Sequence, residues 1–274
     1  MEKADWQAWA RLCPNANIPL YGTDDIGRWP IDDGWDIDAS HRSWDNVNLL
    51  SSWIDEQKHE APQQQEDAPL IDINSLEAEQ RLIFDSYMDA YREILLGENP
   101  PQMLFNIDST AGCGKTYLIT AICQGLRELA DSHDQPDPIR VLAPSGVAAL
   151  NVHGQTVHSG FSLPTNGFSV LSGSRLATMQ LLWKGVYFVI IDEKSMLGLC
   201  SLAQIDSQCR QLIPEHADVP FGNINIALVG DFAQLPPVGD TPLYSPPSSA
   251  ASENGCLSRD GSTLYCLFTR SFSL

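Results

Sequence analysis

Three polar clusters in the 274-residue chain have the composition of a phosphate-handling site: a Gly-Lys-Thr triplet at 114–116, an Asp-Glu pair at 192–193 and a glutamine at 234. A lysine beside glycines binds phosphate oxygens, while a hydroxyl and an aspartate hold Mg²⁺. A glutamate orients or deprotonates the attacking water. An amide after a strand can sense a γ-phosphate. These residue types together predict phosphoryl chemistry on a nucleotide.

The lysine lies in a segment at 108–116 that reads DSTAGCGKT, after an apolar run at 103–107 and before an amphipathic stretch at 117–122. Strand, glycine-bearing turn, Lys-Thr and helix is the order of a phosphate-binding loop, in which backbone N–H groups and a helix N-terminus face the phosphates. The residues predicted to bind nucleotide here are Gly112, Cys113, Gly114, Lys115 and Thr116.

Ser109 departs from the full pattern of such a loop, G-x-x-x-x-G-K-[ST], which has Gly at that position. A Cβ restricts the backbone freedom that Gly supplies. The alternative interpretation of the segment is therefore a strand-to-helix turn with an exposed lysine.

Asp192 directly follows a nearly continuous apolar run at 185–191, which suits a parallel strand covered on both faces. Carboxylates at the carboxyl ends of such strands face the same crevice as the phosphate loop. We therefore expect Asp192 to hold Mg²⁺ beside Thr116, and Glu193 to act on the attacking water. A solvated acidic strand end is the simpler alternative.

Gln234 lies in the most distinctive stretch of the chain, GDFAQLPPV at 230–238, which follows another apolar run at 225–229. We expect its amide to sense the γ-phosphate. The two prolines stiffen the exit from this stretch, and a plain turn after a strand remains open as an alternative.

The elements that must position these residues form an alternating pattern, which predicts an α/β fold with a doubly wound, mostly parallel sheet. The expected strands are 103–107, 139–143, 185–191 and 225–229. The expected helices are 75–97, 117–122, 175–183 and 195–213, the last interrupted near Gly198, and the stretch 144–150 is expected to turn into a short helix. The region after 239 is rich in Pro and Ser and ends in an apolar stretch at 264–268.

The net charge of −19 divides almost equally between residues 1–75, which carry −10, and the remainder of the chain. Neither part has the basic character that favours the DNA backbone, so any contact with nucleic acid must be local. The seven cysteines are scattered and show no C-x-x-C pair, and an odd, scattered set predicts reduced thiols in a cytosolic or nuclear protein. We expect no signal peptide and no membrane association.

Residues 1–70 are predicted to be an acidic, weakly structured extension, with a linker near its end and a folded lobe over 71–274. Six of the seven tryptophans lie in this extension. Tryptophans often anchor interfaces, so a segment that binds a protein partner is the alternative interpretation.

Taken in order, several of these segments resemble the motifs of the Pif-type DNA helicases of superfamily one, which are related to RecD and also occur in Helitron transposons. The resemblance covers about residues 75 to 274, and 230–238 is its most specific part. The residues that carry it are Gln80, 109–116, 145–149, His158-Ser159, 192–196 and 230–238.

The resemblance implies a RecA-like lobe that binds ATP and Mg²⁺ and drives 5′→3′ translocation on single-stranded or forked DNA. Gln80 would contact adenine, and Lys115, Thr116, Asp192, Glu193 and Gln234 would bind or sense ATP·Mg²⁺. The DNA track would include Ser145, Gly146, Thr156 and His158. His158 and Phe161 could stack on bases, or have core or turn roles. DNA repair, recombination, telomere maintenance and a nuclear, or also mitochondrial, location follow from the same resemblance.

Two departures from the family pattern matter. Lys194 stands where the family has an apolar residue, and a buried lysine without a partner is costly unless it reaches solvent or a phosphate. The sequence up to Leu274 contains no recognisable second lobe, whose arginines would complete the ATP site. We therefore expect a truncated helicase, or alternatively a non-catalytic relic that binds nucleotide or DNA. A stand-alone metabolic kinase gives no account of the stretch at 230–238.

Overall fold

The computed structural model describes residues 71–110, 112–163 and 171–274. The predicted acidic extension and its tryptophans lie outside these residues. In the described part, six strands form one sheet in the order β3-β2-β4-β5-β1-β6, and every neighbouring pair is parallel. The strands are β1 (Leu104–Asp108), β2 (Ile139–Ala143), β3 (Gln155–Thr156), β4 (Phe188–Ile191), β5 (Asn225–Gly230) and β6 (Arg270–Ser273).

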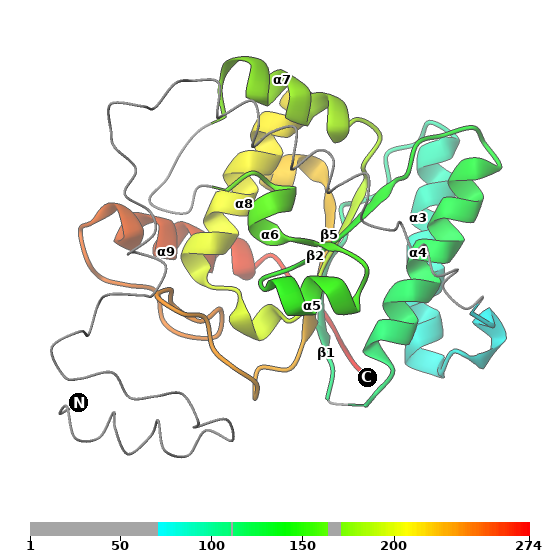
Figure 1. The fold of residues 1–274 in the computed structure, drawn as a ribbon, viewed down its shortest axis with the longest axis horizontal. Helices are drawn as coiled ribbons and strands as arrows, with labels where there is room; N and C mark the ends of the chain where they lie inside the picture. The colour runs from blue at the N-terminus through cyan, green and yellow to red at the C-terminus, as the bar shows by residue number, and fades with distance from the viewer. Residues whose placement is uncertain (1–70, 111, 164–170) are drawn as a thin grey trace, which may run out of the picture. The chain divides into compact units, whose positions relative to one another are not determined.

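Helices cover both faces of this sheet (Figure 1). On one face lie α3 (Ala78–Leu95) and α4 (Lys115–Asp131). On the other lie α7 (Gly173–Leu182), α8 (Leu199–Leu212) and α9 (Glu253–Tyr265). Two short helices, α5 (Gly146–Asn151) and α6 (Val157–Gly160), follow β2 and β3. The four 3-10 turns are η3 (Ile73–Ser75), η4 (Lys194–Met196), η5 (Pro214–His216) and η6 (Pro220–Asn223).

The central strand β4 shows why a continuous apolar run is needed at this place. Phe188 and Ile190 pack into the core under α3 and α4, while Val189 and Ile191 pack into the core under α8 and α9. All four side chains are buried. Because alternate residues point to opposite faces, a strand covered on both sides must be apolar at every position.

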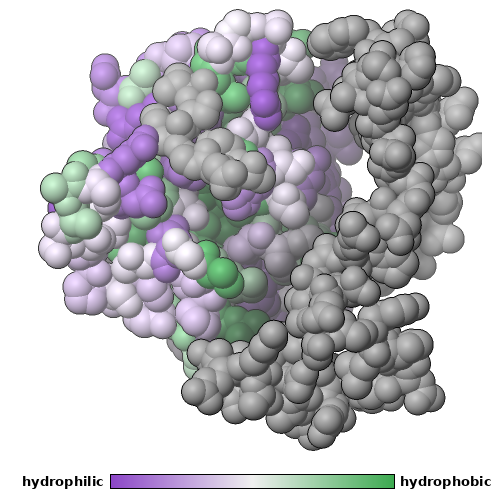
Figure 2. Space-filling model, turned by 60° about the vertical axis from the view of Figure 1, so that its left-hand side comes forward, coloured by the Kyte–Doolittle hydropathy of each residue, from purple (hydrophilic) through white to green (hydrophobic). Residues whose placement is uncertain are grey.

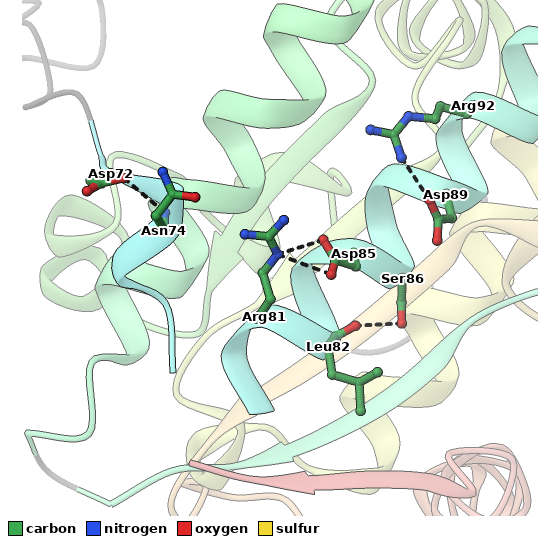
Figure 3. Close-up of polar contacts among 8 residues, drawn as sticks. All are labelled: Asp72, Asn74, Arg81, Leu82, Asp85, Ser86, Asp89 and Arg92. Carbon is green, nitrogen blue, oxygen red and sulfur yellow. Dashed lines mark hydrogen bonds and ion pairs between the residues drawn. The ribbon is translucent and has the colours of Figure 1, made fainter. Parts of the chain in front are cut away.

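The outward face of α3 is polar, as Figure 3 shows. Arg81 pairs with Asp85 at 2.9 Å, and Arg92 pairs with Asp89 at 2.7 Å. Exposed pairs at this spacing contribute only a few tenths of a kcal/mol each, about 0.3–0.5. On the face shown in Figure 2, hydrophobic residues are likewise interspersed with hydrophilic ones over the described surface. No described helix is long and apolar enough to cross a bilayer.

The predicted fold class and all four predicted strands are confirmed, but two strands and two helices, α6 and α9, were missed. Strand β3 has two residues, and β6 (Arg-Ser-Phe-Ser) is an exposed edge without a buried face. Helix α9 contains two glycines, which lower helix propensity. A Cβ on Gly261 would lie 1.9 Å from the Leu199 carbonyl oxygen, so the glycine permits close packing of α9 against α8.

Candidate nucleotide-binding site

The three predicted clusters meet because β5 lies between β1 and β4 in the sheet. The phosphate loop follows β1, the Asp-Glu pair follows β4, and the turn that contains Gln234 follows β5. All three therefore lie at the carboxyl edge of a parallel sheet, where such folds bind ligands. The Ser109 N–H donates to the Gly230 carbonyl at 3.2 Å, which joins the first cluster to the third.

The phosphate loop has the backbone conformation that its glycines predict. Gly112 and Gly114 both have φ of +81°, in the region that favours glycine. A Cβ on Gly114 would lie 2.9 Å from the Gln80 side-chain nitrogen. Ser109, by contrast, is not among the residues with positive φ. The serine therefore fits this position without backbone strain, and its departure from the pattern does not argue against a phosphate loop.

The first turn of α4 leaves backbone donors available at this loop. The N–H groups of Thr116 and Tyr117 have no acceptor among the described residues. The Thr116 side chain is exposed beside them. A helix N-terminus with free N–H groups and a positive dipole end favours an anion, and phosphate oxygens are the ligands that such a loop accepts.

Lys115 is held by both predicted carboxylates. Its Nζ donates to Glu193 Oε1 at 2.7 Å and lies 3.0 Å from Asp192 Oδ1. Burial lowers the pKa of Lys115, but the hydrogen bond with Glu193 and the charge of Asp192 outweigh this effect, so the pKa is raised overall. The Lys115 ammonium therefore stays protonated at neutral pH, between the two carboxylates.

Asp192 is 3% exposed. Burial raises its pKa, and the charge of Lys115 partly offsets that rise. Although Lys115 is close, Asp192 Oδ1 makes no hydrogen bond of good geometry within the described part of the chain. A buried carboxylate oxygen with spare capacity, paired with the lysine that precedes the exposed Thr116, fits the oxygen-donor set that Mg²⁺ prefers.

The backbone around Glu193 takes an unusual course. Glu193 has φ 54° and ψ 49°, a left-handed conformation that is uncommon for a residue with a Cβ. Gly230 has φ of +142°, and a Cβ there would lie 2.9 Å from the Lys194 backbone nitrogen. The two strand ends thus approach so closely that one of them must be glycine.

Gln80 contacts the phosphate loop from the start of α3. Its side-chain nitrogen donates to the Cys113 carbonyl at 3.1 Å, and its oxygen accepts from the Glu77 N–H at 3.2 Å. Both ends of the amide therefore have protein partners. Gln234, by contrast, is exposed, in a turn that is closed by its own N–H donating to the Asp231 carbonyl at 3.1 Å.

The sequence predicts that a buried Lys194 is destabilising unless its ammonium has partners, and the structure shows these partners. The side chain is 0% exposed, and Nζ donates to Asn106 Oδ1 at 2.6 Å and to the Ile107 carbonyl at 3.1 Å. A third hydrogen bond goes to the Asp108 carboxylate. All three ammonium donors are satisfied without solvent or phosphate. No sequence signal could identify these partners, which lie 86 to 88 positions away.

The predicted DNA-track residues lie at the same edge of the sheet: Ser145 and Gly146 follow β2, and Thr156 and His158 lie at and after the end of β3. Ala143 pairs with Thr156 in the parallel register. The Ser145 hydroxyl accepts from the Ala148 N–H and the Thr156 hydroxyl accepts from the Ser159 N–H, both at 3.2 Å. Each hydroxyl therefore caps a short helix. Gly146 and His158 are exposed beside these caps.

Phe161 is a core residue, which resolves one of the open alternatives. It is fully buried, and its ring stacks on Trp183 with centroids 4.8 Å apart. It is thus inaccessible to a base, whereas His158 remains accessible.

Comparison with known proteins assigns the chain that carries these residues to a family. The family model of the PIF1-like helicase matches residues 75–252, which is more than half of the chain. The chain belongs to this family.

Curated relatives of this family member include the ATP-dependent DNA helicase PIF5 of Trypanosoma brucei brucei, 34% identical over 69% of this chain and 18% of the relative. The ATP-dependent DNA helicase PIF1 of Saccharomyces cerevisiae is 31% identical over 54% of this chain and 17% of the relative. The chain thus spans less than one fifth of the length of either. Among solved structures, unliganded Pif1 from Bacteroides sp is 28% identical, with a TM-score of 0.44 over 60% of this chain and 33% of that one.

Proposed function

We propose that the chain binds ATP·Mg²⁺ through the loop at 108–116 and takes part in ATP-driven translocation along single-stranded or forked DNA. The observation that carries the proposal is Lys115, held at 2.7 Å by Glu193 and 3.0 Å from Asp192, beside a helix N-terminus with free donors. This combination supplies both an anion site and a cation site within one crevice. Membership in the PIF1-like family supports the assignment.

Each side chain has a role that its position supports. Lys115 would exchange its carboxylate partners for phosphate oxygens, and Thr116 and Asp192 would hold Mg²⁺. Glu193, freed from the lysine, would accept a proton from or orient the attacking water. Gln234 would hydrogen-bond the γ-phosphate from its exposed turn. Bound ATP·Mg²⁺ supplies the phosphoanhydride bond whose hydrolysis provides the free energy.

The DNA contact is proposed for the exposed surface around α5 and α6. Ser145, Gly146, Thr156 and His158 lie there, beside the nucleotide crevice. Hydroxyls, free backbone groups and an imidazole can bind phosphates and stack on bases without a basic patch. Relatives that are called ATP-dependent DNA helicases are consistent with such a substrate. A nuclear, or also mitochondrial, location and a protein partner for residues 1–70 belong to the same proposal.

Binding of a fluorescent ATP analogue with Mg²⁺ tests the nucleotide site. Removal of the ammonium in Lys115→Ala should weaken binding about ten-fold or more, since charge-assisted bonds to phosphate are lost. Lys184→Ala, which removes an exposed lysine remote from the crevice, is the matched control and should bind as the wild type does. Equal affinities of wild type and Lys115→Ala would contradict the proposal. Binding without DNA-stimulated hydrolysis would favour a nucleotide-binding role alone.

A further inference from the structure

Lys194 lies where three parts of the site converge. Its own backbone continues the Asp-Glu pair after β4, and its N–H lies against Gly230 at the end of β5. Its ammonium bonds Asn106, Ile107 and Asp108, the last three residues of the strand that leads into the phosphate loop. One side chain therefore touches the start of the phosphate loop while its backbone touches the other two strand ends.

The same ammonium also contacts the turn that contains Gln234. Nζ lies 4.6 Å from the centroid of the Phe232 ring, a cation–π distance. Phe232 is in turn packed edge-on against Tyr244, with centroids 5.3 Å apart, and against Tyr265 at 6.4 Å. Because Phe232 is two residues before Gln234, this contact fixes the base of the turn that presents the amide.

We infer that Lys194 is a positioning residue that couples the phosphate loop to the Gln234 turn and thereby sets the preference of the site for nucleoside triphosphate over diphosphate. The inference rests on the proposed function. Phosphates common to ATP and ADP would be bound by the N–H groups of the first turn of α4 and by Lys115, with which the Lys194 ammonium makes no hydrogen bond. The γ-phosphate alone requires Gln234 at a fixed position relative to that loop.

An apolar residue at 194 could fill the same space but could not make these links. Methionine lacks the three donors that hold Asn106, Ile107 and Asp108, and it has no charge to attract the Phe232 ring. Lys194→Met would also remove the desolvation cost of a buried ammonium, and the Asp108 carboxylate left without its partner is about half exposed to water, so the variant should fold. Lys194 thus serves to position the phosphate loop and the Gln234 turn rather than to stabilise the fold.

The first test compares dissociation constants for fluorescent ATP and ADP analogues. Lys194→Met should lower the ADP-to-ATP ratio of dissociation constants about five-fold or more, about 1 kcal/mol, with ADP affinity unchanged. Lys184→Met is the matched lysine control. An unchanged ratio in Lys194→Met, or a wild type that binds both nucleotides equally, would overturn the inference. If the wild type and Lys115→Ala bind ATP with equal affinity, the proposed function itself is overturned.

A second variant tests the same contact from its other partner, and a second measurement tests the coupling without any nucleotide. Phe232→Leu should reproduce the lowered ratio, and the double variant should show no further loss, because both changes break one link. Hydrogen exchange without nucleotide should be faster over 231–238 in Lys194→Met and unchanged over 146–151. Additive losses, or equal exchange over 231–238, would contradict the coupling.

Discussion

The carboxyl edge of the sheet has two sides that are built differently. On the nucleotide side, contacts join residues far apart in the chain: Lys115 and Glu193 are 78 positions apart, and Gln80 and Cys113 are 33 apart. On the proposed DNA side, the hydroxyls of Ser145 and Thr156 bond to backbone only three residues on. The first side is a network of long-range contacts, and the second is a set of local caps.

The difference teaches which parts of the site depend on one another. Residues in one network show interaction energies when changed together, whereas distant sites without shared partners add independently. A change on the nucleotide side should therefore alter ligand binding through its neighbours. A change on the DNA side should act locally and leave nucleotide binding unaltered.

The largest expected effect comes from the close approach of backbone to backbone at Gly230. Gly230→Ala should lower the free energy of unfolding by about 3 kcal/mol, because φ of +142° and the Lys194 nitrogen 2.9 Å away leave no room for a Cβ. Gly239→Ala is the control, since Gly239 has φ of +73° with no heavy atom within 4 Å. It should cost about 1 kcal/mol. Urea unfolding of both variants measures this, and equal losses would contradict the proposed close approach.

A smaller effect is expected at the amide that holds the loop. Gln80→Ala should cost about 1–2 kcal/mol and weaken binding of the ATP analogue several-fold, because the Cys113 carbonyl loses its donor.

Gln102→Ala provides the control for this variant. The Gln102 amide also holds two carbonyls, those of Pro220 and Ile224, but it lines a cavity of about 540 Å³ at the opposite edge of the sheet. It should cost similar stability and leave nucleotide binding unchanged. Equal nucleotide affinity in both variants would show that the loop does not depend on Gln80.

The smallest effects are expected on the DNA side. Ser145→Ala and Thr156→Ala should each cost about 1 kcal/mol, lower Tm by about 2–4 °C, and add independently. Both should weaken binding of a labelled single-stranded oligonucleotide while nucleotide affinity stays constant. Ser252→Ala removes the equivalent cap of α9 and should lose only stability. If Ser252→Ala also loses oligonucleotide binding, the hydroxyls of Ser145 and Thr156 have no specific role in binding DNA.

The fold was predictable where apolar patterning is strong. The run at 185–191 predicted β4 because burial on both faces leaves no other composition. Strand β6 was missed because an exposed edge lacks that constraint, and α9 was missed because its glycines are explained only by the packing of α8 against it.

The site was predictable as a set of residues but not as a set of contacts. Glycine, lysine and threonine in order predicted the loop, whose backbone depends mainly on local conformation. The contacts of Lys194 depend on which strands become neighbours, and one residue cannot encode its distant partners. The caps at 145 and 156 are local, but a hydroxyl at a helix start can cap the helix, bind a ligand or do both, so the sequence did not separate these roles.

The left-handed backbone at Glu193 has a consequence for the evolution of this protein. A residue with a Cβ in this region costs about 1–3 kcal/mol, which is a substantial part of the stability of an ordinary domain. Selection for stability alone would favour glycine here. Glycine, however, would remove the carboxylate that holds Lys115. Glutamate at this position therefore represents a trade-off, in which a less stable fold is accepted for the carboxylate that contacts Lys115.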